Sequence, residues 1–221
     1  MTFPGFGEAV VDFYEGLEAD NTKAYWTDNK AVYDEQVRAP MLALLADLES
    51  EFGAGKVFRP YRDVRFAADK TPYKVQCGAT AGPHYVQVSA DGLMAAGGYY
   101  RMTSGQVARF RAAVDDERHG PALEEIVEGL RADGFTVGGE RLKSRPRGVD
   151  PEHPRLDLLR HKSLFAWCSW PPSDELHEPA LADRVAATWR RLAPLGKWLD
   201  EHVGVDLDDA AERPGGRRSR T

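Results

Sequence analysis

The 221-residue sequence has only two cysteines, and no apolar run approaches the roughly 20 residues of a membrane-spanning helix. Cys77 and Cys168 are far apart, and each lies in an apolar, strand-like run. We therefore predict two buried free thiols in a reducing compartment, with a disulfide across neighbouring strands as the alternative. The N-terminus lacks the basic start of a signal peptide. These absences predict a soluble, cytoplasmic protein.

Motifs with a defined chemistry are missing as well. The sequence contains no GxSxG, GxGxxG or CxxC, and its six histidines do not have the spacing of metal ligands. We assign no metal site and no cofactor. Without a recognisable nucleophile or general base, the sequence leaves open whether the protein is an enzyme.

Positive charge is scarce overall but concentrated in two segments. The formal net charge is -6, which argues against a protein built for nucleic acid or anionic membranes. Residues 59–74 nevertheless carry five Lys or Arg against two Asp, and residues 141–162 carry seven Lys or Arg against three Asp or Glu. The segments 1–56 and 173–212 are acidic. If the fold brings the two basic segments together, they form a positively charged cleft that concentrates anions.

The spacing of apolar residues predicts helices in the N-terminal, central and C-terminal parts of the chain. Pro40 predicts a kink or break near Arg38 and Ala39, because proline lacks the N–H that a helix interior needs. Thr103 and Gln106 have the spacing of a capping box, which marks the start of a helix. The expected helical regions are about 6–17, 22–52, 103–114, 121–133, 156–159 and 176–195.

Two other regions predict an antiparallel sheet. Alternating apolar residues over about 57–102 indicate three or four strands, with a two-residue hairpin turn at Asp91-Gly92, where both positions favour positive φ. The run SLFAWCSW at 163–170 indicates a further strand, central and covered on both faces. Together with the helices, these strands predict a single α+β domain over 1–203. The polar remainder, 204–221, is predicted to be a disordered tail.

The first basic segment has the alternation of a strand. If 59–66 is extended, Val64 and Phe66 point toward the core. Arg62 shares their face and needs a partner, because an unpaired buried guanidinium is very costly. Asp69 can accept hydrogen bonds from the backbone of the turn that follows.

The same segment carries a resemblance to a known family. RPYRDVRFAADKTPYK fits the pattern R-x-x-R-D-x-R-F-x-x-D-K-x-P-Y-K at every fixed position. With NTKAYWTDNKAVYDEQVRAP, GGYY, LKSRPRG and HPRLDLLRHKS, the chain resembles the bacterial domain-of-unknown-function family numbered 2461 over about residues 6–172. The resemblance implies one α+β domain and brings no activity with it.

The favoured hypothesis is a site for a small anionic, phosphorylated ligand, formed by residues 59–74 and by the loop at 143–147. Arginine suits such a ligand because its guanidinium makes bidentate contacts to phosphate and carboxylate. The predicted ligand-binding residues are Arg59, Arg62, Asp63, Arg65, Asp69, Lys70, Tyr73, Lys74, Lys143, Arg145 and Arg147.

Several alternatives stay open at this level. Arg62 and Arg65 can instead orient Asp63 and Asp69 in a structural ion-pair network, within a non-catalytic module that docks a protein partner. The two aspartates can also be read as a pair for acid–base work or for a metal. Nucleic-acid binding is the weaker alternative, because the acidic body repels the phosphate backbone. The sequence does not predict the oligomeric state.

Overall fold

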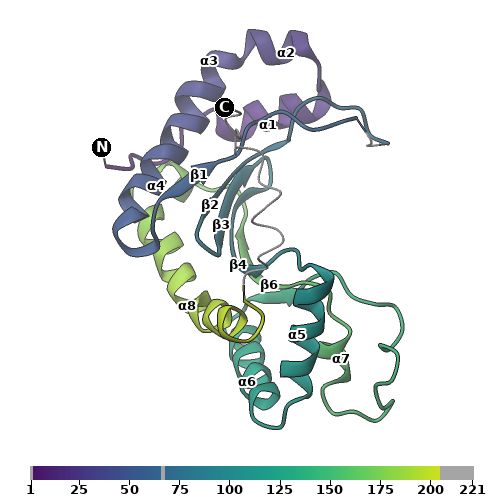
Figure 1. The fold of residues 1–221 in the computed structure, drawn as a ribbon. Coiled ribbons are helices and arrows are strands. Elements are labelled where there is room, and N and C mark those ends of the chain that lie inside the picture. Colours follow the sequence, from purple (N-terminus) through teal and green to yellow (C-terminus); the bar gives the residue numbers. More distant parts are fainter. Residues whose placement is uncertain (1, 66–67, 205–221) are drawn as a thin grey trace, which may run out of the picture. The chain divides into compact units, whose positions relative to one another are not determined.

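The computed structural model describes residues 2–65 and 68–204 and shows an α+β fold (Figure 1). Within these residues, six strands form one sheet in the order β1-β2-β3-β4-β6-β5, and β1 to β4 pair antiparallel. The strands are β1 Gly55–Val57, β2 Gln76–Ala81, β3 His84–Ser89, β4 Gly92–Tyr99, β5 Thr136–Gly138 and β6 Leu164–Trp170. The helices are α1 Val10–Ala19, α2 Lys23–Asp28, α3 Lys30–Val32, α4 Ala39–Phe52, α5 Ser104–Asp115, α6 His119–Ala132, α7 Leu156–Leu159 and α8 Leu181–His202.

The chain divides into two compact units. The first comprises the residues up to Gly97 together with Trp167–Leu192, and the second comprises Gly98–Ala166 and the residues from Ala193 onward. Strands β4 and β6 and helix α8 contribute residues to both units. The predicted α+β class is confirmed, while the limits 1–203 for a single domain stay a prediction. Of the predicted tail, 205–221 lie outside the described residues.

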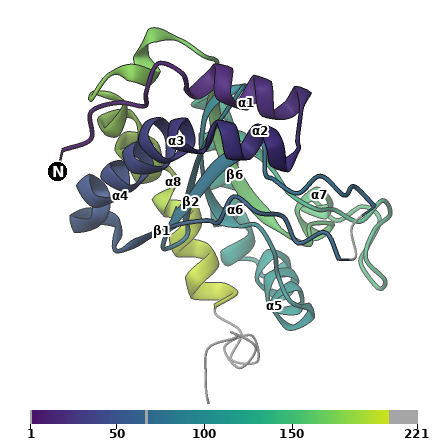
Figure 2. The same cartoon turned by 90° about the horizontal axis from the view of Figure 1, so that it is seen from above.

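In the first unit, helices α1 and α4 pack against strands β1–β3 (Figure 2). The buried face of β2 and β3 follows the alternation of the sequence, with Cys77 and Ala79 opposite Val88 and Val86. The helices cover this face with side chains that are at most 3% exposed: Val10, Phe13, Tyr14, Leu17, Met41 and Leu44. The predicted helix stripe and the predicted inner strand face are therefore confirmed.

Pro40 changes the type of helix and does not end the helical region. The chain forms a π-helix over Tyr33–Arg38 and then continues as α4. Because proline has no N–H, the carbonyl of Gln36 four residues earlier needs another donor. The N–H of Gly7 supplies it at 3.0 Å, and a Cβ on Gly7 would lie 2.4 Å from Gln36 Cβ. The predicted break is thus a π-helix held by the N-terminal segment.

The β3–β4 hairpin lies where it was predicted, but its turn is shifted by one residue. Ser89 pairs with Gly92, so the loop residues are Ala90 and Asp91. Gly92 has φ +95°, whereas no other residue type has positive φ in the described chain, which excludes the predicted geometry at Asp91. Gly92 is required for a second reason, because a Cβ there would lie 2.2 Å from the carbonyl oxygen of Trp170.

Strand β6 confirms the prediction for 163–170 but not its burial on both faces. Leu164 and Ala166 are buried, whereas Phe165 and Trp167 are half-buried and Ser169 is exposed. Only alternate residues reach the core, so this apolar run is not a fully covered strand. Its second face carries aromatic side chains that are partly open to solvent.

The second unit confirms the predicted helix signals. The Thr103 side chain accepts from the N–H of Gln106, and the Gln106 side chain accepts from the N–H of Thr103, as a capping box requires. Trp198 of α8 packs edge-on against Phe110, with ring centroids 6.0 Å apart, and its Nε1 donates to the carbonyl of His119 at 3.1 Å. Helix α6 is followed by Gly134 at φ +85°.

Two whole-chain expectations can be compared with the described residues. None of the helices found there is both long and apolar enough to cross a membrane. Cys77 is buried and Cys168 is half-buried, and neither forms a disulfide, so only one of the two thiols is fully covered.

Candidate functional site

The segment between β1 and β2, residues 58–75, forms an arm that runs out from the ends of these strands (Figure 1). Backbone hydrogen bonds join its two limbs: Phe58 N–H donates to Gly78, Lys74 N–H to Pro60 and Arg62 N–H to Pro72, at 2.7–2.9 Å. Beyond them, the described residues of the tip have no regular structure. The predicted strand is wrong over 59–65, where only Tyr61 is paired, in an isolated bridge to Tyr73.

Asn21 and Trp26 anchor the arm to the helices of the first unit. The Asn21 carboxamide accepts from the N–H of Tyr73 at 3.0 Å and donates to its carbonyl at 3.2 Å, as a neighbouring strand would. The Tyr73 ring is 5% exposed and stacks on Trp26, with ring centroids 4.5 Å apart and an interplanar angle of 10°. Tyr61 forms an antiparallel bridge with Tyr73, and its ring also packs against Trp26. Tyr73, a candidate ligand contact, is thus a core residue that fixes the arm.

Ion pairs within the tip use two of the predicted cations. The Arg62 guanidinium contacts the Asp69 carboxylate and the Thr71 hydroxyl, which supplies the partner that the sequence required. Arg65 makes a bidentate pair with Asp63, with N–O distances of 2.9 and 2.7 Å. Val64, expected in the core, is only half-buried, and Phe66 lies outside the described residues.

The hydrogen bonds of the tip lower the pKa of both aspartates. Arg65 donates to Asp63 from its side chain and its backbone, which lowers the pKa of Asp63 to about 2. The N–H and hydroxyl of Thr71, followed by Arg62, lower the pKa of Asp69 to about 2. Both carboxylates are therefore ionised at neutral pH and already accept hydrogen bonds. Carboxylates in this state are unsuited to act as a general acid or base.

Three cations of the arm have no carboxylate partner among the described residues, and they are Arg59, Lys70 and Lys74. Lys74 is half-buried, and its ammonium nitrogen lies 5.3 Å from the centroid of the Phe58 ring. Burial and the positive charge of Arg59 both lower the pKa of Lys74. Lys70, at the tip, donates to the carbonyl of Val64 at 2.9 Å. Arg59 and Lys74 are therefore the cations without a carboxylate at the base of the arm.

Beside Lys74, the sheet face opposite the helices carries polar and aromatic groups. Phe58 continues the register of β1 opposite Gly78 and stacks on Tyr85, with ring centroids 6.2 Å apart. The Tyr85 hydroxyl donates to the Gln87 side chain at 2.7 Å. A Cβ on Gly78 would lie 2.4 Å from the Tyr85 hydroxyl, so the glycine lets this ring lie across the strand.

Sequence reasoning missed Phe58, Tyr85 and Gln87. The signal was present, because the inward alternation of His84, Val86 and Val88 places Tyr85 and Gln87 on the opposite face of the strand. The charge pattern drew attention to the tip of the arm, whereas these residues lie at its base.

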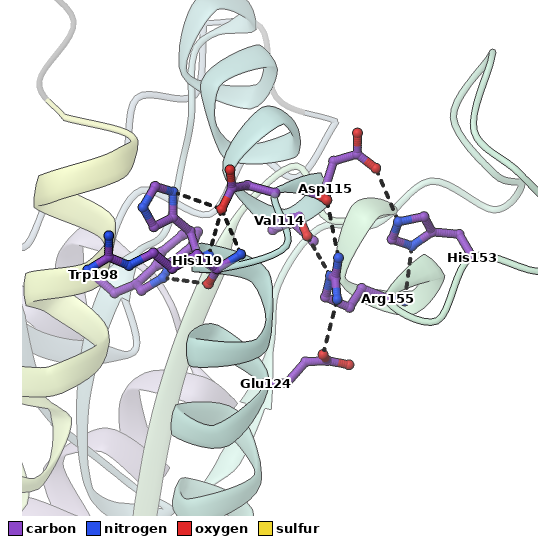
Figure 3. A network of polar contacts seen from close by, with 9 residues as sticks. Val114, Asp115, His119, Glu124, His153, Arg155 and Trp198 are labelled. Carbon is purple, nitrogen blue, oxygen red and sulfur yellow. Dashed lines mark hydrogen bonds and ion pairs between the residues drawn. The ribbon is translucent and has the colours of Figure 1, made fainter.

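In the second basic segment, Arg155 connects the loop to helices α5 and α6 (Figure 3). Arg155 has a side chain that is 11% exposed and donates to the carbonyls of Val114 and Asp115 at 2.6 and 3.1 Å, where helix α5 ends. His153 accepts from the N–H of Arg155 at 3.0 Å and contacts the Asp115 carboxylate at 3.1 Å. A Cβ on Gly120 would lie 2.4 Å from Arg155 Nε, so glycine makes room for this cap.

The predicted loop residues differ in how they are held. Arg145 donates to the carbonyl of Val149, and the carbonyl of Lys143 accepts from Arg160 at 2.9 Å. The side chains of Lys143 and Arg147 are exposed and have no ion pair within the described chain. The loop belongs to the second unit and the arm to the first.

Most of the chain, including the arm and the second basic segment, matches a known protein family. The family model DUF2461, described as a conserved hypothetical protein, matches residues 9–198 and so covers most of the chain. No curated protein matches it. The described residues contain no group of three or more His, Cys, Asp or Glu that could hold a metal ion.

Proposed function

The chain belongs to the DUF2461 family of conserved hypothetical proteins, and we propose that it binds a small anionic, phosphorylated ligand at the base of its arm. The observation that carries the proposal is Lys74. This half-buried ammonium lies beside Arg59 and has no carboxylate partner in the described chain.

Burial and charge both favour an anion at this place. Desolvation and the charge of Arg59 destabilise the charged form of Lys74, which is why its pKa is lowered. An anion held between the two cations removes part of this cost and restores the pKa toward its ordinary value. Arg62 and Arg65 are engaged by Asp69 and Asp63, so they shape the tip of the arm and leave Arg59 and Lys74 to the ligand.

We test the proposal by thermal unfolding with phosphorylated metabolites, nucleotides, inorganic phosphate, pyrophosphate and sulfate. A ligand at about 100 times its dissociation constant stabilises the folded state by about 2.7 kcal/mol, a readable shift in Tm. Lys74→Met removes the ammonium and should weaken binding about tenfold or more, because a hydrogen bond to a charged group contributes about 1.5–3 kcal/mol. Lys23→Met, an exposed lysine of the same unit, is the matched control.

The pH dependence adds a second readout. Sulfate keeps a constant charge at neutral and alkaline pH, so its affinity reports on the protein alone. Because the charged ammonium binds the anion, sulfate affinity should fall as pH rises through the lowered pKa of Lys74. A flat panel, or equal binding by wild type and the Lys74→Met variant, would contradict the proposal.

The second candidate is a non-catalytic module that docks an acidic protein partner through the arm. It is favoured by the exposed aromatic residues Phe58 and Tyr61, which are 37% and 48% exposed, and by the ion pairs that stiffen the tip. This candidate predicts no response to small anions and binding to an acidic polypeptide. Nucleic-acid binding, the weaker candidate, predicts an affinity that falls steeply with salt concentration.

The contribution of Lys143, Arg145 and Arg147 to the ligand site stays a prediction from the sequence. An Arg147→Met variant tests it with the same anions. Weaker binding in this variant would support the prediction, and unchanged binding would confine the site to the arm.

A further inference from the structure

We propose that the ligand of the arm carries a planar aromatic ring next to its anionic group, as nucleotides and aryl phosphates do. This inference rests on the proposed anion site and names the chemical class of its ligand. It is drawn from the face that Phe58, Tyr85 and Gln87 form beside Lys74.

An aromatic surface lies next to the cation. Phe58 is 37% exposed, although it directly follows β1 and its N–H donates to Gly78 of β2. Its ring is offset-stacked on Tyr85 at an interplanar angle of 29°. Tyr85 is half-buried, so the exposed Phe58 ring is the part of this platform on which a flat ring can stack, as bases stack on aromatic side chains.

The local sequence makes room for the Tyr85 ring. Gly78 has no side chain at the point where Tyr85 crosses the strand, since a Cβ there would lie 2.4 Å from the tyrosine hydroxyl. Tyr85 is in turn held by its hydrogen bond to Gln87 at 2.7 Å. The remaining amide hydrogens of Gln87 have no acceptor within the described residues, and they can meet the polar edge of a heteroaromatic ring.

The distance between the two parts limits the ligand. Lys74 Nζ lies over the Phe58 ring in a cation–π contact, 5.3 Å from its centroid, so the ammonium and the ring adjoin each other. A ligand that uses both must carry its negative charge close to its ring. An inorganic anion can bind only the ammonium, and an uncharged aromatic ring can stack only on the platform.

The experiment measures the dissociation constants of inorganic phosphate, phenyl phosphate, adenosine and AMP for the full chain by calorimetry. We expect phenyl phosphate and AMP to bind at least about tenfold more tightly than inorganic phosphate, from the stacking of one ring. Phe58→Leu should lower the affinities for phenyl phosphate and AMP to that of inorganic phosphate for the same variant. Phe58→Tyr keeps a ring and should keep the ratio, and Gly78→Ala, which displaces Tyr85, should reduce it.

The outcomes separate this inference from the proposed function. Equal affinities for inorganic phosphate and phenyl phosphate, or a ratio that survives Phe58→Leu, would overturn the aromatic ligand and leave the anion site standing. Absence of binding by every phosphate would overturn both. Tighter binding of AMP than of phenyl phosphate would support a nucleotide, and the reverse order would support an aryl phosphate.

Discussion

At the scale of single residues, the cations of one short motif have different surroundings. Arg62 and Arg65 contact carboxylates of the tip, whereas Arg59 and Lys74 have no carboxylate partner among the described residues. Sequence spacing placed all four in one segment but could not distinguish them. Which cations are paired depends on the directions of their side chains. The tip of the arm is not a strand, so these directions do not follow the alternation of an ideal strand.

The lowered pKa of Asp63 gives a prediction at this scale. The folded-state pKa of about 2 lies below the ordinary value of about 3.9, so the Arg65 pair stabilises the fold above about pH 4 and loses its effect as pH falls toward 2. Arg65→Gln should return the pKa of Asp63 toward its ordinary value, as measured by NMR titration of the carboxyl carbons.

Asp69 is the internal control for this titration. Its pKa is lowered first by the N–H and hydroxyl of Thr71, so it should stay near 2 in the Arg65→Gln variant. If Asp63 still titrated near 2 without the guanidinium, the assigned cause of its shift would be wrong.

At the scale of elements, side chains close the ends of helices and strands. The N–H groups of Gly7 and Ala9 donate to the backbone carbonyl and the side-chain oxygen of Gln36. Helix α4 can therefore begin directly after a π-helix. Arg155 satisfies the carbonyls at the end of α5 from a loop some forty residues away in the sequence. In both cases the unpaired backbone groups of a helix find partners outside it.

The Arg155 cap gives a prediction at this scale. Arg155→Met removes two hydrogen bonds to backbone carbonyls and should lower the free energy of unfolding by about 1–3 kcal/mol. Arg147→Met, in the same basic segment but exposed, should change it by less than about 0.5 kcal/mol. Urea denaturation of both variants provides the measurement, and equal losses would show that Arg155 is no cap.

At the scale of the whole molecule, the two compact units share continuous elements. Helix α8 runs unbroken over Leu181–His202, and β4 and β6 also contribute to both units. An interruption within these elements would disturb residues of both units, so we expect one cooperative unfolding transition.

Fluorescence can test this expectation, because Trp198 is the one tryptophan that belongs to the second unit. In a Trp198→Phe variant the emission reports on the first unit alone, while circular dichroism follows the helices of both. Coincident midpoints in urea would support one folding domain over 1–203. Separate midpoints would show that the units unfold independently.

The sequence by itself predicted much of the fold. Three predictions were correct: the helix start marked by Thr103, the inward alternation of Val86 and Val88, and the buried stripe that includes Trp189 and Leu192. Burial and capping follow from the sequence of short segments. The family followed from one sixteen-residue motif, and a family model that covers residues 9–198 confirmed it.

Only the tertiary structure decided how the motif is used. Asp91 was misplaced in its turn and Val64 in the core, because strand register and the end of a strand depend on pairing with other segments. The contact between Lys74 and Phe58 was likewise not predicted from the sequence, because the two residues lie on opposite limbs of the arm. Residue types and spacing set the local elements and the charge of this protein, whereas the tertiary structure set which of these charges are paired with a carboxylate.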